Sequence, residues 1–128
     1  MRALLDTCVL LWWVGDPQRL SRSARTLLED PDATLFWSAA SSWEVALKAS
    51  SRGLRLPAPP REFVRRMLEE EGILSLPIED RHALHVLDLP RHHRDPFDRL
   101  LVAQAQIEAL ALVSSDPDLR AYDVEVLW

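Results

Sequence analysis

Four acidic residues stand at separate places in the chain and could together hold a metal ion: Asp6, Glu44, Asp98 and Asp116. Carboxylates gathered within a few ångströms repel one another, and one of them takes up a proton unless a cation offsets the charge. Ligand sets made of oxygen alone favour Mg²⁺ or Mn²⁺ over zinc, which prefers histidine and cysteine. Mg²⁺ also keeps several waters, so that one can attack a phosphodiester. The residue types therefore point to metal-assisted hydrolysis.

Two of the acids near residue 98 have a simpler interpretation as helix caps. Asp95 suits the N-cap of a helix whose first residue is Pro96, and Asp98 then falls in the first turn. Both positions favour an acid because the backbone N–H groups and the helix dipole attract negative charge. We interpret Asp95 as a residue that supports the site from outside and Asp98 as a metal ligand.

The remaining acids can also be read without a metal. Glu44 and Lys48 are four residues apart on a predicted helix and could form a surface pair. Asp116 opens the sequence "DPD", which is typical of a turn. Asp6 is the hardest to explain in this way, because it interrupts the apolar segment "ALLDTCVLLWW" and burying an unpaired carboxylate is unfavourable.

Polar residues beside these acids are candidate helpers. Thr7 follows Asp6 directly, and Ser115 directly precedes Asp116. Either hydroxyl could orient a carboxylate or a water, although hydroxyls are also common in ordinary turns. In the loop "RHHR", Arg91, His93 and Arg94 could contact phosphates, with histidine gaining charge at mildly low pH. A solvated polar loop is the equal alternative.

Apolar patterning predicts which elements carry these residues. Strands are expected within 3–5, 34–38, 73–78, 111–116 and 124–128. Helices are expected over 7–15, 21–30, 38–50, 61–72, 79–89 and from about 95 to 110, and a proline-containing connector over 52–60. On the helix over 38–50 we expect an inward apolar stripe formed by Ala39, Ala40, Trp43, Ala46 and Leu47.

This alternation of strands and helices predicts an α/β fold with three layers, in which a mostly parallel sheet of about five strands lies between helices. Ligands of such sheets bind beyond the carboxyl ends of the strands. Asp6 and Asp116 follow predicted strands directly. If those two strands are neighbours, the four acids can meet at one edge of the sheet.

Composition sets the remaining limits. The length of 128 residues suits one domain spanning 1–128, and no apolar run approaches the roughly 20 residues that cross a bilayer. The single cysteine, Cys8, and the lack of a signal-peptide pattern favour the cytoplasm. The net charge of −5 is unusual for a nucleic-acid binder. A metal ion can offset acids in the site, and fourteen arginines are available for phosphates.

Several other residue groups are assigned to packing or solvent. Arg61, Arg65 and Arg66 form a basic strip that we interpret as a solvated helix face. The tryptophans at 12, 13, 37 and 43 lie in apolar segments, which favours packing in the core or in a dimer over base stacking. A zinc site built from the histidines at 82, 85, 92 and 93 is disfavoured, because it would lack cysteine and be crowded by arginines.

Four segments of the chain carry a resemblance to a known family: "LLDTCVLLWW", "SAASSWEVALK", "HRDPFDRLLVAQA" and "LVSSD". In this order they resemble the PIN-domain nucleases, specifically the VapC-like toxins of bacterial toxin–antitoxin pairs. The segment around "DPFDRLLVAQA" is the most specific. Carried over to this chain, the acidic site of that family falls on Asp6, Glu44, Asp98 and Asp116, while Asp95 lies beside it.

The resemblance implies a Mg²⁺- or Mn²⁺-dependent endoribonuclease that hydrolyses RNA phosphodiesters. It also implies a homodimer and a cognate antitoxin protein, with which the toxin would form a hetero-oligomer. An acid-lined groove would attract a basic antitoxin segment that competes with metal and RNA. The metal ligands implied are Asp6, Asp98 and Asp116, and no membrane is involved.

Two other functions fit part of this pattern. A phosphoryl-accepting signalling domain also gathers acids near its first strand, but it needs a lysine late in the chain, and the only lysine here is Lys48. A catalytically inert PIN-like module for protein interaction would have lost one or more of the acids. All four are present, which favours the enzyme.

Overall fold

A five-stranded, fully parallel sheet forms the centre of the protein. The computed structural model describes residues 1–51 and 53–128, and Arg52, the first residue of the predicted connector, lies outside the described residues. The strand order is β3-β2-β1-β4-β5. The strands are β1 (Arg2–Leu5), β2 (Thr34–Ser38), β3 (Leu74–Leu76), β4 (Ala111–Val113) and β5 (Val126–Leu127). The predicted fold class is therefore confirmed, and the first strand of the chain is its central strand.

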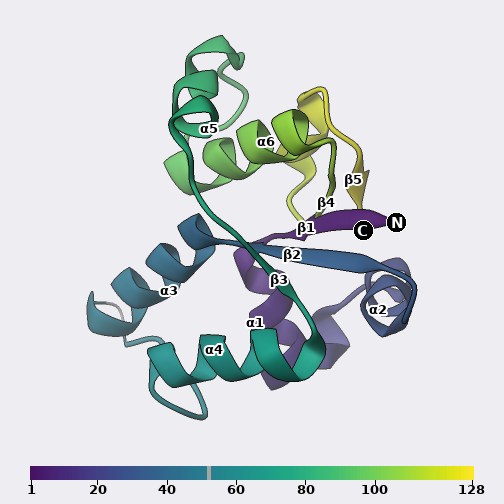
Figure 1. Ribbon diagram of the computed structural model, residues 1–128, viewed down its shortest axis with the longest axis vertical. Helices are drawn as coiled ribbons and strands as arrows, with labels where there is room; N and C mark the ends of the chain where they lie inside the picture. Colours follow the sequence, from purple (N-terminus) through teal and green to yellow (C-terminus); the bar gives the residue numbers. More distant parts are fainter. Residues whose placement is uncertain (52) are drawn as a thin grey trace.

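Helices connect the strands and cover both faces of the sheet. Within the described residues they are α1 (Thr7–Gly15), α2 (Arg22–Glu29), α3 (Ala39–Ser51), α4 (Pro60–Glu71), α5 (Asp80–His85) and α6 (Pro96–Glu108), with short 3₁₀ helices η1 (Pro17–Arg19), η2 (Val86–Asp88) and η3 (Pro117–Ala121). Figure 1 shows α5 and α6 on one side of the sheet and α1, α2 and α4 on the other. None of the described helices combines the length and apolar character that crossing a bilayer requires.

Two hydrophobic clusters hold the helices to the sheet. In β1, Ala3 and Leu5 face the cluster under α1, α2 and α4, whereas Leu4 faces the cluster under α6. This follows from the alternation of side chains along a strand. All three are fully buried, so β1 contributes to both cores, as expected for the central strand of a parallel sheet.

The carboxyl ends of β1 and β4 meet at one edge of the sheet. The two strands pair directly, with Leu5 opposite Val113. The backbone N–H of Asp6 extends this pairing by donating to the carbonyl of Val113 at 2.9 Å. Asp6 and the residues that follow β4 are thereby fixed next to each other, which meets the condition that the sequence set for the acids to gather at this edge.

Several helix ends follow the predicted chemistry. Ser21 caps α2 by accepting the N–H of Ala24 at 3.0 Å, and Gly72 ends α4 with a φ of 64°, a left-handed conformation that glycine adopts without strain. The last helix ends two residues earlier than predicted, because Ala109 turns to a φ of 55°. The strands β3, β4 and β5 are also shorter than their apolar segments.

The predicted apolar stripe of α3 is confirmed at Ala40 and wrong at Trp43, Ala46 and Leu47, which are exposed. The helix buries Ala40, Ser41, Glu44 and Val45, whereas Trp43 is 58% exposed and Leu47 is 43% exposed. The rotation brings Glu44 inward, where it forms an ion pair with Lys48. Helical periodicity alone predicted a different inward face, because it counts apolar residues and cannot detect an ion pair that offsets the charge of a buried glutamate.

Candidate active site

Two of the four predicted acids meet around one histidine at the edge of the sheet. Nε2 of His93 lies 2.7 Å from Oδ2 of Asp116 and 3.3 Å from Oδ2 of Asp98. Asp98 comes from the first turn of α6, and Asp116 comes from the turn after β4. One potential ligand atom from each of the three residues lies within 4.8 Å of the others, so this group is compact enough to surround one ion.

A serine connects Asp6 to the same group. The Ser114 hydroxyl donates to Oδ2 of Asp6 at 2.7 Å and accepts the backbone N–H of Asp116 at 3.1 Å. The predicted helper Ser115 is exposed instead, because residues after a strand alternate between inward and outward directions. Sequence adjacency to Asp116 favoured Ser115, but the strand register selects Ser114.

The other predicted helper, Thr7, lies behind the acids. Its hydroxyl donates to the Ser41 hydroxyl at 2.8 Å, and both side chains are buried. This bond joins the first turn of α1 to α3, the helix that carries Glu44. Thr7 therefore fixes the position of α3 through its hydroxyl, and its backbone N–H donates to Asp6, which lowers the pKa of that carboxyl.

Glu44 is buried, with 7% of its surface exposed. Oε2 of Glu44 lies 2.7 Å from Nζ of Lys48, and this hydrogen bond raises the pKa of Lys48 above its usual value. The sequence-based pair between the two residues is therefore present. It does not explain the burial of Glu44, because an exposed i,i+4 pair needs no inward position.

Burial and neighbouring charges shift the pKa values of two acids at this edge. Burial raises the pKa of Asp98 from 3.8 to about 7, and the charges of Asp6 and Asp95 add to this effect. Burial also raises the pKa of Asp6, which the hydrogen bond from Ser114 opposes. Since the charges of Glu44 and Asp116 act on Asp6 as well, the four acids share one electrostatic environment.

His93 is oriented by the backbone of its own loop. Its Nδ1 accepts the N–H of Asp95 at 3.0 Å, so in the neutral ring the proton resides on Nε2 and is donated to Asp116. Tyr122 also holds the loop, because its hydroxyl accepts the His93 backbone N–H at 2.9 Å. Burial of the ring opposes its charged form, but the bond to Asp116 and the nearby carboxylates raise the pKa of His93.

The remaining predicted residues surround this group. Asp95 is the N-cap of α6 and accepts the Phe97 N–H at 2.9 Å, with Pro96 as the first helical residue. Arg91 and Arg94 are exposed. The structure thus turns His93 toward the acids, whereas both arginines face solvent.

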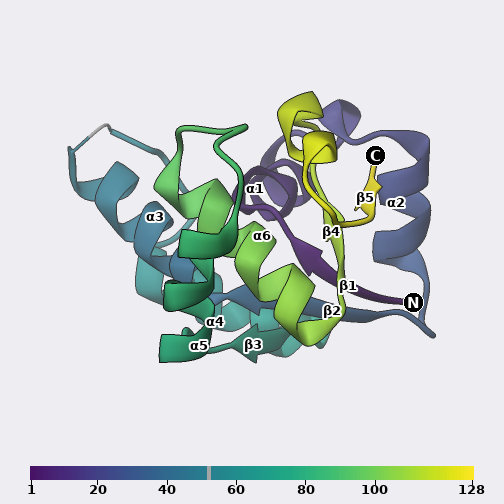
Figure 2. The ribbon, with the colours of Figure 1, turned by 90° about the horizontal axis from the view of Figure 1, so that it is seen from above.

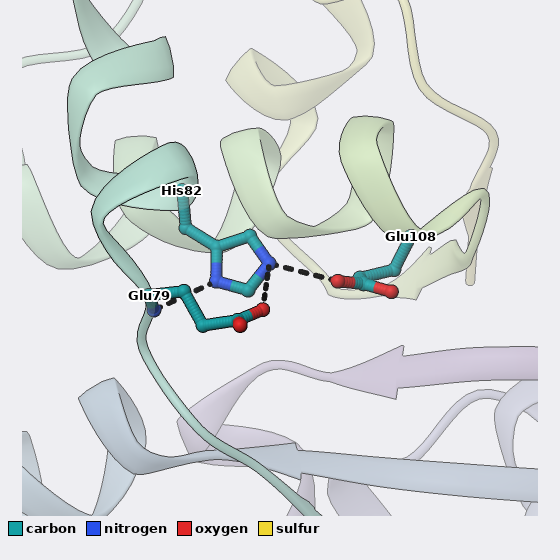
Figure 3. Close-up of side chains that lie close together, drawn as sticks. All are labelled: Glu79, His82 and Glu108. Atoms are coloured by element: carbon teal, nitrogen blue, oxygen red, sulfur yellow. Dashed lines mark hydrogen bonds and ion pairs between the residues drawn. The ribbon is translucent and has the colours of Figure 1, made fainter.

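A second group of metal-binding residue types lies at the opposite end of α6. Nδ1 of His82 accepts the Glu79 N–H at 3.0 Å, and its Nε2 lies 2.9 Å from Oε1 of Glu108 (Figure 3). Arg81 forms ion pairs with both glutamates. This group caps α5 and joins it to α6, and its charges are already balanced. It shares no histidine with the site at residue 93.

A wide groove in the described part of the chain lies apart from the acidic site. A groove of about 1650 Å³ runs between α3 and α4 and is lined mainly by apolar side chains. None of the four acids lines it. Because hydrolytic chemistry needs ionisable groups rather than volume, the acidic edge is the candidate active site.

The acidic edge has the donor chemistry of a site for a hard divalent cation. Its potential ligands are carboxylate oxygens, with one imidazole at their side, and oxygen donors favour Mg²⁺ or Mn²⁺. Burial, together with the neighbouring charges of Asp6 and Asp95, raises the pKa of Asp98, so its ionised form is unfavourable at this position. The residues present therefore fit a metal ion.

Comparison with known proteins identifies the family. The PIN-domain family model matches residues 3–125. The chain belongs to the PIN-domain family. It is 33% identical to ribonuclease VapC22 of Mycobacterium tuberculosis over 121 residues, which cover 93% of this chain and 90% of that protein.

Solved structures show the same PIN fold. The VapBC2 complex of Rickettsia felis bound to a promoter DNA fragment has a TM-score of 0.75 at 13% identity, and the match covers 98% of this chain and 97% of that one. VapBC-5 of Mycobacterium tuberculosis, a member of a family of toxin–antitoxin systems, has a TM-score of 0.63 at 18% identity, with 98% and 96% covered. At these identities the likeness concerns the fold.

Replacing Ser114 with alanine should destabilise this PIN domain because it leaves the Asp6 carboxylate and the Asp116 N–H without their shared partner. We expect Ser114→Ala to lower the free energy of unfolding by about 1–3 kcal/mol, measured by urea denaturation. Ser115→Ala is the matched control and should change it by less than about 0.5 kcal/mol. Equal effects of the two substitutions would contradict the assignment of Ser114.

The raised pKa of Asp98 predicts a pH-dependent gain in stability on neutralisation. The carboxyl ionises near 3.8 in the unfolded chain and near 7 in the folded one, so its ionisation destabilises the metal-free protein increasingly between these values. In EDTA, Asp98→Asn should therefore raise the melting temperature by several degrees at about pH 8 and much less at about pH 4.

Thermal unfolding followed by circular dichroism measures this difference. Asp123→Asn, at an exposed aspartate, serves as the control and should show no such trend. A stabilisation by Asp98→Asn that is the same at both pH values would rule out the shifted ionisation as its cause.

Proposed function

We propose that this PIN-domain chain is a Mg²⁺- or Mn²⁺-dependent endoribonuclease that hydrolyses RNA phosphodiester bonds. The observation that carries the proposal is the gathering of Asp6, Asp98 and Asp116 at one edge of the sheet, where His93 and Ser114 join them. The charge of Glu44 acts on both Asp6 and Asp98. The relative named ribonuclease VapC22 matches nearly the full length of the chain and supports the same reaction here.

Three carboxylates are proposed to hold the ion: Asp6, Asp98 and Asp116. When bound, the ion would supply Lewis-acid polarisation of the scissile phosphate and offset the negative charge of its ligands. The Ser114 hydroxyl holds Asp6 toward Asp116. We propose that Glu44, fixed by Lys48, accepts a hydrogen bond from the attacking water and so orients it.

The surroundings of the acids suggest how substrate and ligands are positioned. His93 donates to Asp116, so we propose that it orients this carboxylate rather than contacting RNA first. Arg91 and Arg94 are exposed beside it and can meet phosphates, for which a guanidinium provides a planar pair of donors. Asp95 holds the first turn of α6, which carries Asp98.

We further propose that the chain is the toxin of a cytoplasmic toxin–antitoxin pair and forms a homodimer. The structures of toxin–antitoxin complexes that share this fold support the proposal. An antitoxin segment rich in arginine or lysine would complement the acidic edge and the net charge of −5. Such a segment would compete with both metal and RNA, and the resulting hetero-oligomer would be inactive.

Cleavage of RNA should require both a divalent ion and the acids. We expect purified protein to cleave single-stranded RNA in Mg²⁺ or Mn²⁺, and EDTA to stop the reaction. Asp6→Asn or Asp98→Asn should lower the rate roughly 100-fold or more while the circular dichroism spectrum stays folded. The control is Asp123→Asn, expected to cleave at the wild-type rate, and full activity in either site variant would refute its assignment.

The toxin role predicts an effect on growth that depends on the same acids. Induced expression of the wild-type chain in a bacterial host should slow growth, and Asp98→Asn should relieve the effect at equal protein level. Co-expression of a neighbouring small antitoxin gene should restore growth. Normal growth at high wild-type expression would argue against a toxin, while leaving the ribonuclease proposal to the cleavage assay.

A further inference from the structure

An exposed aromatic pair lies at the rim of the acidic site. The Trp43 side chain, 58% exposed, packs edge-on against Phe97, with ring centroids 5.1 Å apart and an interplanar angle of 65°. Trp43 directly precedes Glu44 on α3, and Phe97 directly precedes Asp98 on α6. The pair therefore joins the two helices that deliver these acids, on the side that faces away from the core.

A pocket of about 550 Å³ lies on the Phe97 side of this pair, and Trp43 is outside its lining. It is lined by Glu44, Leu47, Lys48, Ser51, Arg94, Asp95, Pro96 and Phe97. Its volume is within the usual range for small-molecule pockets, and its walls combine aromatic and aliphatic surface with charged groups. Such a mixture suits a nucleotide better than the core of a protein interface, where charged residues are depleted.

The charges around the pocket leave one group without a partner. Lys48 is held by Glu44 at 2.7 Å, and Asp95 accepts the Phe97 N–H to cap α6. In the described part of the chain, Arg94 has neither an ion-pair partner nor a side-chain hydrogen bond. Its exposed guanidinium is thus free to bind an anion beside the aromatic pair.

We propose that Trp43, Phe97 and Arg94 form a subsite for one unpaired nucleotide next to the scissile bond, with the base stacked on Trp43 and its phosphate bound by Arg94. The inference rests on the proposed ribonuclease function. RNA that reaches the acids must pass their rim, and every base offers an aromatic face for stacking. An unpaired base exposes that face, so the subsite selects single-stranded RNA with little regard to base identity.

RNA binding by Trp43 variants tests the stacking. On an Asp6→Asn background in Mg²⁺, fluorescence anisotropy measures the affinity for a labelled single-stranded RNA of about twelve nucleotides. Trp43→Leu, which keeps an apolar side chain without the ring, should weaken binding roughly 5- to 100-fold. Trp43→Phe should restore most of it. Leu87→Ala, at a residue that is 82% exposed on η2, is the control and should bind like the background.

A series of abasic RNAs gives a second readout that a structural role would not change. Each RNA lacks one base. At the stacked position, removal of the base should weaken binding to the background protein, and Trp43→Leu should then add no further loss. If Trp43→Leu weakens binding equally for every RNA in the series, no base stacks on Trp43 and the subsite is wrong.

Salt dependence tests the role of Arg94. Arg94→Gln should reduce the slope of log affinity against log salt by about 0.7, the value for one phosphate contact on a single strand. Arg22→Gln, at an exposed residue on α2, is the control and should leave the slope unchanged. An unchanged slope for Arg94→Gln would remove this residue from the proposal.

Sedimentation velocity distinguishes the alternative in which a second copy of the chain covers Trp43. Dissociation of a dimer by Trp43→Leu, with RNA affinity per protomer unchanged, would overturn the subsite in favour of an interface between copies. RNA cleavage and binding that are intact in Trp43→Leu would overturn the subsite alone. Absence of RNA binding and cleavage in the wild-type protein, with metal binding retained, would overturn the proposed function as well.

Discussion

The cost of burying carboxylates close together is the constraint on which the rest of this structure depends. Burial raises the pKa of Asp6 and of Asp98, and the charges of neighbouring acids add to the effect. A chain that gathers such groups loses stability unless something compensates them. Ser114, Lys48 and the loop histidine each hold one carboxylate in place without neutralising the group as a whole. The arrangement is consistent with a protein whose acids are positioned in advance for a cation, at the expense of stability in its absence.

Much of this architecture could be predicted from sequence because the relevant signals are local. Strand-to-acid junctions at Asp6 and Asp116 and the Asp95–Pro96 helix start each depend on a few adjacent residues, and the alternation of elements fixes the parallel sheet. The metal-binding and catalytic roles of the acids stay predictions. Their proximity is a structural result, since it depends on β1 and β4 being neighbours.

The features that the sequence could not indicate depend on the rotation of a helix about its axis and on the register of a strand. The direction in which the chain leaves β4 decides whether the side chain of Ser114 or that of Ser115 faces the acids, and a shift of one residue would reverse the outcome. The inward face of α3 carries Glu44, which is paired with Lys48, whereas Trp43 and Leu47 lie in solvent despite their apolar character. Distant partners were also hidden: Tyr122, which fixes the His93 loop, lies 29 residues further along the chain.

The central position of β1 has a consequence for the timing of synthesis. β1 is synthesised before β4, which is its second neighbour in the sheet, and the Ser114–Asp6 hydrogen bond spans 108 residues. A nascent chain with β4 still inside the exit tunnel cannot close its sheet or assemble the acidic edge. Any catalytic activity of this fold therefore begins only when nearly all of these residues have emerged, and a partner translated beforehand would already be present at that moment.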